Sequence, residues 1–175
     1  MGADLHGLSP ASEWIQRYAA LIRPQGTVLD VACGAGRHMQ FLSGLGLSCL
    51  GIDQSEAALE HAQAHGEVIC ADIEGAAWPI PGRRFDAVVV THYLWRPLFP
   101  VLINALNEGG VLLYETFAQG QETVGKPSRP EFLLRPGELL EVAQIHGLAV
   151  VAFEDVWLDH PRRRMQRLVA ARGFH

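Results

Sequence analysis

The strongest constraint on the fold is an apolar run, FDAVVVTHYL, at residues 85–94. Continuous Val-rich runs of this kind are typical of parallel strands that are buried on both faces of a sheet. Shorter apolar runs of similar character alternate with segments whose apolar residues recur at helical spacing. This alternation predicts a parallel sheet wound by right-handed crossovers, with helices on both faces. The expected strands of this part are 27–32, 47–53, 66–72, 85–94 and 109–117, and the expected helices between them are 37–45, 55–65 and 97–107.

The C-terminal segment breaks this alternation. Two expected strands, residues 148–158 and 165–172, are joined only by the short segment DHPRRR. Strands joined by a short turn must run antiparallel. The sequence therefore predicts an α/β fold, a three-layer Rossmann-like sandwich whose seven-stranded sheet is mostly parallel and carries a C-terminal antiparallel hairpin near one edge.

Helix boundary signals lie on both sides of the expected sheet. Ser9 and Pro10 predict the start of an N-terminal helix, because serine is a favoured cap and proline is favoured at the first helical position. Pro136 opens a further expected helix that runs to His146 and is closed by a glycine. No internal repeat or linker interrupts the sequence, so we expect residues 1–175 to form a single domain.

The composition indicates a globular chain and argues against several classes of function. Of its 175 residues, 49% are hydrophobic and 19% are charged, which separates the chain from disordered sequences. The formal net charge is -5, whereas nucleic-acid-binding proteins usually present a basic face, so we expect no nucleic-acid partner. No apolar run approaches the roughly 18 residues of a membrane span, and the first residues lack a signal pattern, so we expect a cytoplasmic protein that contacts no membrane. Cys33, Cys49 and Cys70 are too far apart for a paired metal site, so we expect reduced, buried thiols and no bound metal.

A glycine-rich turn follows the first expected strand in the segment VLDVACGAGRH, residues 28–38. Gly34 and Gly36 allow the backbone to approach a ligand without an intervening side chain. In open α/β sheets, ligands bind outside the carboxyl ends of the strands, where this turn is expected. A Walker phosphate loop would need a lysine after its last glycine, and none follows here. A dinucleotide site would need a third glycine where Met39 stands, so an NAD-dependent reductase is the weaker alternative.

Three acids belong to successive expected strands: Asp30 lies in the first, Asp53 ends the second and Asp72 ends the third. Such carboxylates suit a ligand that carries a ribose, an adenine and a cationic amino acid, as S-adenosylmethionine does. Asp53 can accept hydrogen bonds from both ribose hydroxyls, as it would also in an NAD site. Asp72 can accept from the exocyclic amine of adenine, while the backbone N–H of Ile73 is available to a ring nitrogen.

Four segments together resemble a known family. VLDVACGAGRH, GIDQS, CADIEGAAWPIPGRRFDAVVV and NEGGVLLYE are similar, in order, to the successive motifs of class I S-adenosylmethionine-dependent methyltransferases. The match spans residues 27–115, and its Gly-Arg-His ending looks most like the small tellurite-resistance-type and related small-molecule methyltransferases. Ala32 stands where the family most often has glycine, which is a mild departure. The resemblance implies an enzyme that binds S-adenosyl-L-methionine, releases S-adenosyl-L-homocysteine and methylates a small-molecule acceptor.

The same resemblance divides the domain and implies roles for its residues. Residues 1–25 would form an N-terminal helix, residues 26–115 the cofactor-binding half, and residues 116–175 a substrate loop with the C-terminal hairpin. Arg37 would either pair with the cofactor carboxylate or cover its helix, and the sequence does not separate these alternatives. The implied cofactor-binding residues are Asp30, Ala32, Cys33, Gly34, Gly36, Arg37, Asp53, Gln54, Asp72, Ile73 and Thr91.

The acceptor is expected beyond the fourth strand, at the segment THYLWRP. His92 and Tyr93 are the candidate catalytic residues, because a histidine side chain can accept a proton near neutral pH; a packing role for His92 is the alternative. Trp95 is a candidate wall of the acceptor site. Lys126 and Arg129 lie in the long loop after the fifth strand and are candidate contacts to an anionic acceptor.

Two other functions remain open from the sequence. The cluster Arg162–Arg164 is either a solvated hairpin tip or a contact to RNA, so an RNA methyltransferase that uses this hairpin is one alternative. A non-catalytic S-adenosylmethionine-binding protein is the other. The fourth strand is followed neither by an Asn/Asp-Pro-Pro-Tyr motif nor by a Pro-Cys nucleophile, and together with the acidic charge this favours a small-molecule acceptor. The sequence specifies neither the acceptor atom nor the oligomeric state.

Overall fold

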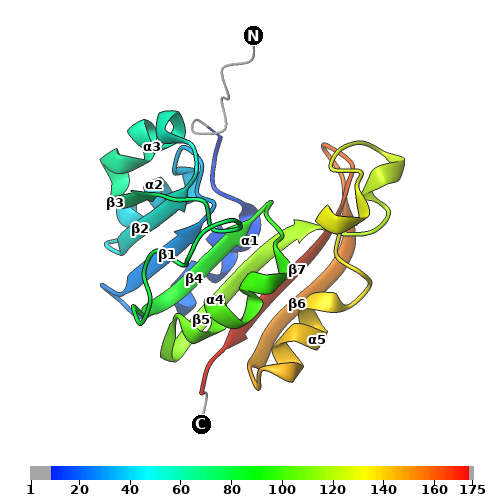
Figure 1. Ribbon diagram of the computed structural model, residues 1–175. Coiled ribbons are helices and arrows are strands. Elements are labelled where there is room, and N and C mark those ends of the chain that lie inside the picture. Colours follow the sequence, from blue (N-terminus) through cyan, green and yellow to red (C-terminus); the bar gives the residue numbers. More distant parts are fainter. Residues whose placement is uncertain (1–8, 174–175) are drawn as a thin grey trace.

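Seven strands form one sheet in the computed structural model, which describes residues 9–173 (Figure 1). Their order across the sheet is β3-β2-β1-β4-β5-β7-β6. The order reverses beside β1, between β1 and β4, and such a switch point is where open α/β sheets place a ligand. The strands are β1 (Thr27–Val31), β2 (Ser48–Asp53), β3 (Glu67–Cys70), β4 (Phe85–Thr91), β5 (Leu106–Phe117), β6 (Ala149–Leu158) and β7 (Arg163–Ala171).

The strand directions confirm the predicted sheet. Strands β1 to β5 pair in parallel, whereas β7 is antiparallel to both β5 and β6. The hairpin of β6 and β7 therefore does not simply extend the edge, because its second strand lies between β5 and its first. In this arrangement the turn at residues 159–162 returns to the edge of the sheet where the parallel strands end.

Helices cover both faces of the sheet, as predicted (Figure 1). Alternate side chains of each strand point to opposite faces, so Val28 and Val89 pack with the buried residues of the first three helices, while Leu29 and Val88 pack with those of the last two. The helices are α1 (Glu13–Tyr18), α2 (Arg37–Gly44) and α3 (Glu56–Ala62) on the first face, and α4 (Phe99–Asn104) and α5 (Glu138–Ile145) on the second.

The helix boundaries predicted from proline were wrong by two to three residues. Helix α1 begins at Glu13, and the Oγ of Ser12, not Ser9, caps it by accepting from the backbone N–H of Trp14 at 3.2 Å. Helix α5 begins after Gly137, which has a φ of 70°. In both cases the proline lies in the approach to the helix, because a competing polar or glycine residue nearer the apolar run takes the cap position.

Several strand ends also differ from the prediction, among them the start of β7, which is Arg163 rather than residue 165. Strand β3 ends at Cys70 and β4 ends at Thr91, because the chain turns sharply after each, with His92 at a φ of 53°. Strand β5 begins at Leu106, which pairs with Phe85 before an irregularity in the register. The expected helix up to residue 107 is therefore shorter, and it ends at Asn104.

Two further expectations concern cysteines and membranes. All three cysteines are unpaired; Cys33 and Cys49 are buried as expected, but Cys70 is exposed at the end of edge strand β3. Within residues 9–173, none of the helices has the length and apolar character needed to cross a bilayer. In the same residues, His, Cys, Asp and Glu side chains form no group of three or more that is placed to hold a metal ion.

Candidate active site

Three adjoining hollows lie where the parallel strands end. The Asp53 hollow has a volume of about 220 Å³ and the Thr91 hollow one of about 230 Å³, and Ala32 lines both. The Asp53 hollow is lined by Ala32, Asp53, Gln54, Ala71, Asp72, Ile73, Glu74 and Tyr93. The Thr91 hollow is lined by Ala32, Cys33, Gly34, Ala35, Arg37, His38, Thr91 and His92.

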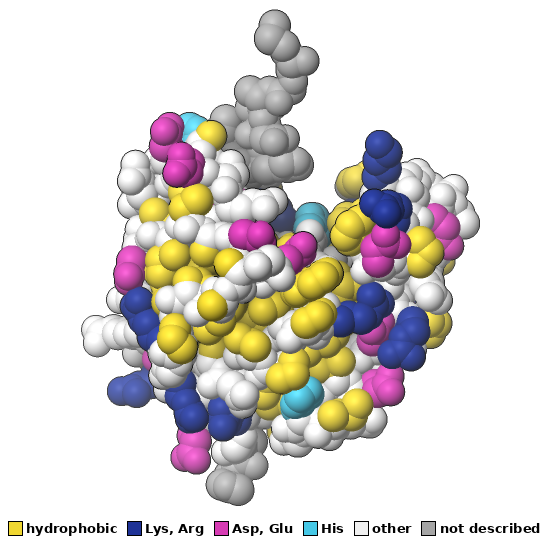
Figure 2. Space-filling view, viewed as in Figure 1, with side chains coloured by type: hydrophobic (Ala, Val, Ile, Leu, Met, Phe, Trp, Pro, Cys, Tyr) yellow, Lys and Arg dark blue, Asp and Glu magenta, His cyan; other side chains and the backbone are white. Residues whose placement is uncertain are grey.

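The third is the Lys126 hollow, with a volume of about 510 Å³. It shares Arg37 and His92 with the Thr91 hollow, so the three form a continuous row. Figure 2 shows the surface hollowed between two raised parts, with a histidine and a basic side chain at the floor. The other residues lining the Lys126 hollow are Ser12, Glu13, Glu115, Phe117, Gln121, Val124, Gly125, Lys126, Pro161, Arg162, Arg163 and Arg167.

The turn after β1 places glycine backbone, which carries no side chain, beside this row of hollows. Gly34 and Gly36 have φ values of 56° and 86°, which glycine adopts without strain. A Cβ at Gly34 would meet nothing within 4 Å, whereas one at Gly36 would lie 2.9 Å from the Cα of Ala62 in α3. Gly34 therefore leaves space in the Thr91 hollow, and Gly36 permits close packing of the two helices. Ala32, at a φ of 54°, adopts the left-handed conformation without being glycine.

Asp53 connects the end of β2 to this turn. Its Oδ2 accepts from the backbone N–H of Gly34 and its Oδ1 from that of Ser55, each at 2.9 Å. Each carboxylate oxygen can accept a second hydrogen bond. Asp53 is therefore both a support of the turn and an available acceptor on the wall of its hollow.

Asp30 is buried beneath the turn and lacks a full set of partners. Its side chain is 1% exposed, and its Oδ2 has no hydrogen-bond partner among the described residues. Burial raises the pKa of Asp30 to about 7, while the charge of Arg37 lowers it and that of Asp53 raises it. A buried carboxyl oxygen without a partner is costly unless a donor or a cation reaches it, so Asp30 fits a ligand that brings one.

Arg37 and His38 tie the N-terminal segment to the turn. Arg37 Nη1 donates to the carbonyl of Pro10 at 3.1 Å, and the backbone N–H of Ser12 donates to His38 Nε2 at 3.1 Å. Burial lowers the pKa of His38 to about 3, so the ring is neutral. Because Nε2 accepts, we assign the proton to Nδ1, which lies 3.4 Å from the hydroxyl of Thr91. Both side chains thus position the segment that carries one wall of the Lys126 hollow.

The loop after β3 shapes the other end of the row. Asp72 Oδ1 accepts from the backbone N–H groups of Glu74 and Gly75, both at 3.0 Å, and these bonds lower the pKa of Asp72. The hydroxyl of Tyr93 donates to Glu74 at 2.9 Å, and burial, followed by this bond, raises the pKa of Tyr93. Tyr93 lines the Asp53 hollow and keeps its proton, which does not suit the catalytic role expected for it on the acceptor side.

His92 lies at the junction between the Thr91 and Lys126 hollows. Its backbone N–H donates to the carbonyl of Glu115 at 3.0 Å, and its ring packs on Phe117 with 4.9 Å between ring centroids. The turn conformation at His92 thus directs one ring toward the place where the two hollows meet.

A buried ion pair supports the Lys126 hollow. Arg167 Nε lies 3.0 Å from Glu115 Oε2, and the two side chains are 5% and 4% exposed. Arg167 also pairs with Glu154 at 3.2 Å and lies over the ring of Trp14 at 5.4 Å. The sequence analysis missed Glu115, although its position at the end of a parallel strand is the signal that identified the three aspartates.

One buried amide joins the long loop to the hairpin. The Gln121 side chain donates to the carbonyl of Lys126 at 3.0 Å and accepts from the backbone N–H of Arg164 at 2.8 Å. Gln121 is 4% exposed. It therefore holds Lys126 and the start of β7 against each other, which brings two distant basic segments to one hollow.

Comparisons with known proteins agree with this geometry. Residues 28–110 match a family model described as a methyltransferase domain. A Mycolicibacterium smegmatis protein named a probable S-adenosylmethionine-dependent methyltransferase is 25% identical over 168 residues, which covers 82% of this chain and 62% of that protein. The ubiquinone biosynthesis O-methyltransferase of Thiobacillus denitrificans is 30% identical over 127 residues, covering 64% and 53%. The crystal structure of TehB from Haemophilus influenzae superposes with a TM-score of 0.74 at 22% identity, covering 93% of this chain and 62% of that one.

Residues 28–110, just under half of the chain, are thus similar to a methyltransferase domain, and the chain shares the fold of TehB over most of its length. The chain spans less than two thirds of the length of the two curated relatives, and the likeness to TehB concerns the fold. S-adenosylmethionine is the cofactor that the resemblance implies, and the residues present fit it. The partner-free oxygen of Asp30, the two oxygens of Asp53 and the open space at Gly34 are the observations that support this fit.

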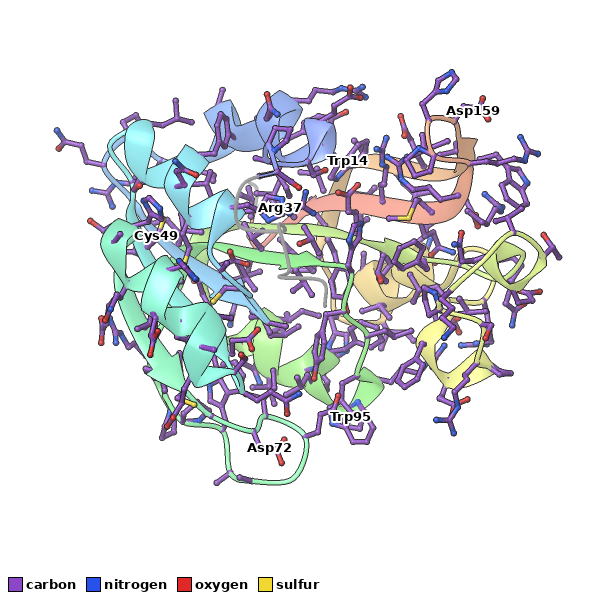
Figure 3. The ribbon with its side chains drawn as sticks, turned by 90° about the horizontal axis from the view of Figure 1, so that it is seen from above. Trp14, Arg37, Cys49, Asp72, Trp95 and Asp159 are labelled. Carbon is purple, nitrogen blue, oxygen red and sulfur yellow. The ribbon has the colours of Figure 1, made fainter. Side chains whose placement is uncertain are left out.

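The fold brings most of the expected site residues together, and leaves some apart. Gly36 packs on α3 and lines none of the three hollows. Trp95 and Arg129 do not line them either, and Arg129 pairs with Glu131 at 3.0 Å. Figure 3 shows Arg37 near the centre of the strand ends, with Asp72 and Trp95 toward one margin.

Proposed function

We propose that this methyltransferase transfers a methyl group from S-adenosylmethionine to a small-molecule acceptor in the Lys126 hollow. The observation that carries the proposal is the continuous row of hollows, with carboxylates at one end and His92 at the last junction. Binding sites for small molecules commonly have volumes of about 300 to 1,000 Å³, so the roughly 510 Å³ of the Lys126 hollow suits such an acceptor.

The cofactor would lie along the first two hollows. Asp53 would accept from the ribose hydroxyls, with Gln54 beside the adenine, and Asp72 and Ile73 would contact the adenine edge. Tyr93, which lines the same hollow, would cover that base rather than act in catalysis. Asp30 is buried beneath the turn and lines none of the three hollows, so it would face the methionine ammonium from below, directly or through water, while Arg37 in the Thr91 hollow would face the carboxylate. The residues beside the methionine and ribose would be Ala32, Cys33, Gly34 and Thr91.

The chemistry asks the protein mainly for alignment and exclusion of water. When bound, the cofactor supplies a methyl group whose bond to sulfur breaks, with its electron pair left on sulfur, as the acceptor atom bonds to the methyl carbon. His92 would accept the proton of an acceptor atom that carries one. Phe117 holds the His92 ring from one side, so a neighbouring acceptor meets a base of fixed orientation.

The hairpin arginines favour a small molecule over RNA. Arg162 pairs with Asp159 at 3.3 Å, and Arg164 pairs with Asp155. Arg162 also lies over the ring of Trp157, at 4.5 Å. Two of the three charges are thus already balanced within the hairpin, which leaves little free charge for phosphate contacts. RNA binding that weakens steeply as salt rises would instead support the RNA alternative.

Calorimetric titration with S-adenosylhomocysteine, followed by a methyl-release screen with thiol, phenol and oxyanion acceptors, tests the proposal. The substitution Asp53→Ala should weaken the binding of S-adenosylhomocysteine by about one to three kcal/mol, roughly 5- to 150-fold, because it leaves polar partners unpaired. Glu60→Ala is a matched control, because it removes an exposed carboxylate from neighbouring α3. No binding by the unaltered chain, or equal affinity in both variants, would contradict the proposed placement. Binding without turnover of any acceptor in the screen would favour the non-catalytic alternative.

A further inference from the structure

The Lys126 hollow has an excess of positive charge. Three of its basic residues, Arg37, Lys126 and Arg163, form no ion pair with a described carboxylate, although acids lie elsewhere on the same surface. Arg37 is shared with the Thr91 hollow. Lys126 and Arg163 therefore remain as charges that belong to the acceptor side alone.

Two other cations of the hollow are already paired. Arg162 pairs with Asp159, and Arg167 pairs with Glu115 beneath the surface. Glu13 is exposed and precedes the buried part of α1. Among the described residues, three unpaired cations thus outnumber the one unpaired acid of the lining, and a cleft with an excess of one sign of charge concentrates ligands of the opposite sign.

The backbone segments that carry the two cations are held in place by the protein. Gln121 binds the backbone of Lys126 on one side and that of Arg164, the neighbour of Arg163, on the other. Arg163 Nη1 also donates to the carbonyl of Pro161 at 2.9 Å. Pre-positioned groups lose less conformational freedom when a ligand binds, so this arrangement favours recognition of a specific group.

The rest of the hollow suits an apolar body. Phe117, Val124 and Pro161 lie on its wall, together with the His92 ring that packs on Phe117. A water molecule occupies about 30 Å³ of liquid, so an inorganic oxyanion would fill a small part of the roughly 510 Å³ available. An organic molecule with one anionic end matches both the volume and the lining.

We propose that the acceptor is an organic carboxylate whose anionic group binds Lys126 and Arg163 and whose methylated atom lies beside His92. This inference rests on the proposed function and specifies the acceptor class of the same site. The carboxylate is a handle that stays unmethylated. The proton of the acceptor thiol or hydroxyl passes to His92 as its sulfur or oxygen takes the methyl group.

The probes for the test are 4-mercaptobenzoate and its neutral methyl ester, which share the thiol and the ring and differ in charge. Binding to the S-adenosylhomocysteine complex is measured by calorimetry, and methylation is measured as KM and kcat. The carboxylate should bind at least about tenfold more tightly than the ester, the scale of a hydrogen bond to a charged group. The double variant Lys126→Gln/Arg163→Gln should abolish that preference while leaving the affinity for S-adenosylhomocysteine unchanged. Arg84→Gln, an exposed change at the opposite end of β4, should preserve it.

Lys126 also offers a readout that does not depend on turnover. It is the one lysine of the sequence, so an amine-reactive reagent has a single side-chain target. Bound 4-mercaptobenzoate should slow its modification, and the ester should not. Equal binding of acid and ester, an unchanged preference in the double variant, or no protection of Lys126 would overturn the inference. If S-adenosylhomocysteine binds and a neutral acceptor is methylated in those cases, the proposed function stands; a chain that binds no S-adenosylhomocysteine overturns both.

Discussion

The Asp53 hollow and the Lys126 hollow lie on the same edge of the sheet but differ in charge and in origin. The first is acidic and, apart from Tyr93 after β4, is built from residues at or directly after the ends of β1, β2 and β3. The second is basic and combines α1, a loop after β5 and the hairpin tip, which lie far apart in sequence. A binding site for a constant ligand can thus be local in sequence, whereas a site for a variable ligand is assembled from segments that can change separately.

The two hollows also differ in how their charged groups are fixed. Asp53 is held by two backbone N–H groups of adjacent turns. The Lys126 side depends on side chains, namely the Gln121 amide and the buried pair of Arg167 with Glu115. We therefore expect substitutions on the Lys126 side to affect stability most strongly and those on the Asp53 side to affect cofactor binding most strongly.

The largest expected effect comes from breaking the buried ion pair. Arg167→Met should lower the free energy of unfolding by about 3 to 5 kcal/mol, because it leaves the Glu115 carboxylate buried without its main partner. Urea denaturation followed by circular dichroism measures this loss. The double variant Arg167→Met/Glu115→Gln should recover part of it, since no unpaired charge remains. A loss below 1 kcal/mol in the single variant would show that the Lys126 side does not depend on this pair.

A smaller effect is expected on the pH dependence of stability, because of the buried carboxyl of Asp30. Its pKa in the folded protein is about 7, above the 3.8 of an ordinary aspartate, so the folded state binds the proton more tightly. Stability from this group is complete below pH 3.8 and is lost as pH rises toward 7, by roughly 3 kcal/mol between pH 4.5 and 7 at about 1.4 kcal/mol per unit. Denaturation of the ligand-free protein across that range should show the slope, and Asp30→Asn should remove it. Asp159→Asn, an exposed change, is the control that should retain it. An unchanged slope in Asp30→Asn would locate the pH dependence elsewhere.

The smallest expected effect is a difference between alanine substitutions at the two glycines of the turn after β1. Gly36→Ala should cost about 2 kcal/mol of stability, because its Cβ would lie 2.9 Å from backbone of Ala62 at a φ of 86°. Gly34→Ala should cost about 1 kcal/mol, since its Cβ meets nothing within 4 Å, but should weaken S-adenosylhomocysteine more than Gly36→Ala does. Thermal denaturation and calorimetry on both variants measure the contrast. The reverse order in either measurement would contradict the assignment of Gly34 to the ligand side.

The two hollows also differ in how well they could be predicted from the sequence. Apolar periodicity identified the seven strands and their directions, and strand ends identified Asp53 and Asp72, because these features depend on neighbours along the chain. Boundaries were less accurate where two caps compete, as at Ser9 and Ser12. A proline or serine indicates that a helix begins nearby. It does not indicate which of two candidate residues will cap the helix in the folded protein.

The Lys126 side could not be assembled from the sequence. Its position depends on β7 lying between β5 and β6, a choice of strand order that local patterns do not encode. Arg163 was therefore grouped with a hairpin tip, and Lys126 with Arg129, although the structure joins Arg163 and Lys126. Tyr93 was placed with His92 because they are adjacent, but the turn after β4 sends them to different hollows.

Strand β7 lies inside the sheet although it follows the other six strands along the chain. On the ribosome, residues 106–158 emerge before residues 163–171. The edges of β5 and β6 that will pair with β7 therefore stay unpaired until β7 is synthesised. Unpaired strand edges are the places where nascent chains associate wrongly. Translation that stalls before residue 163 would therefore yield a product whose Asp53 hollow is complete and whose remaining edge is exposed to other chains.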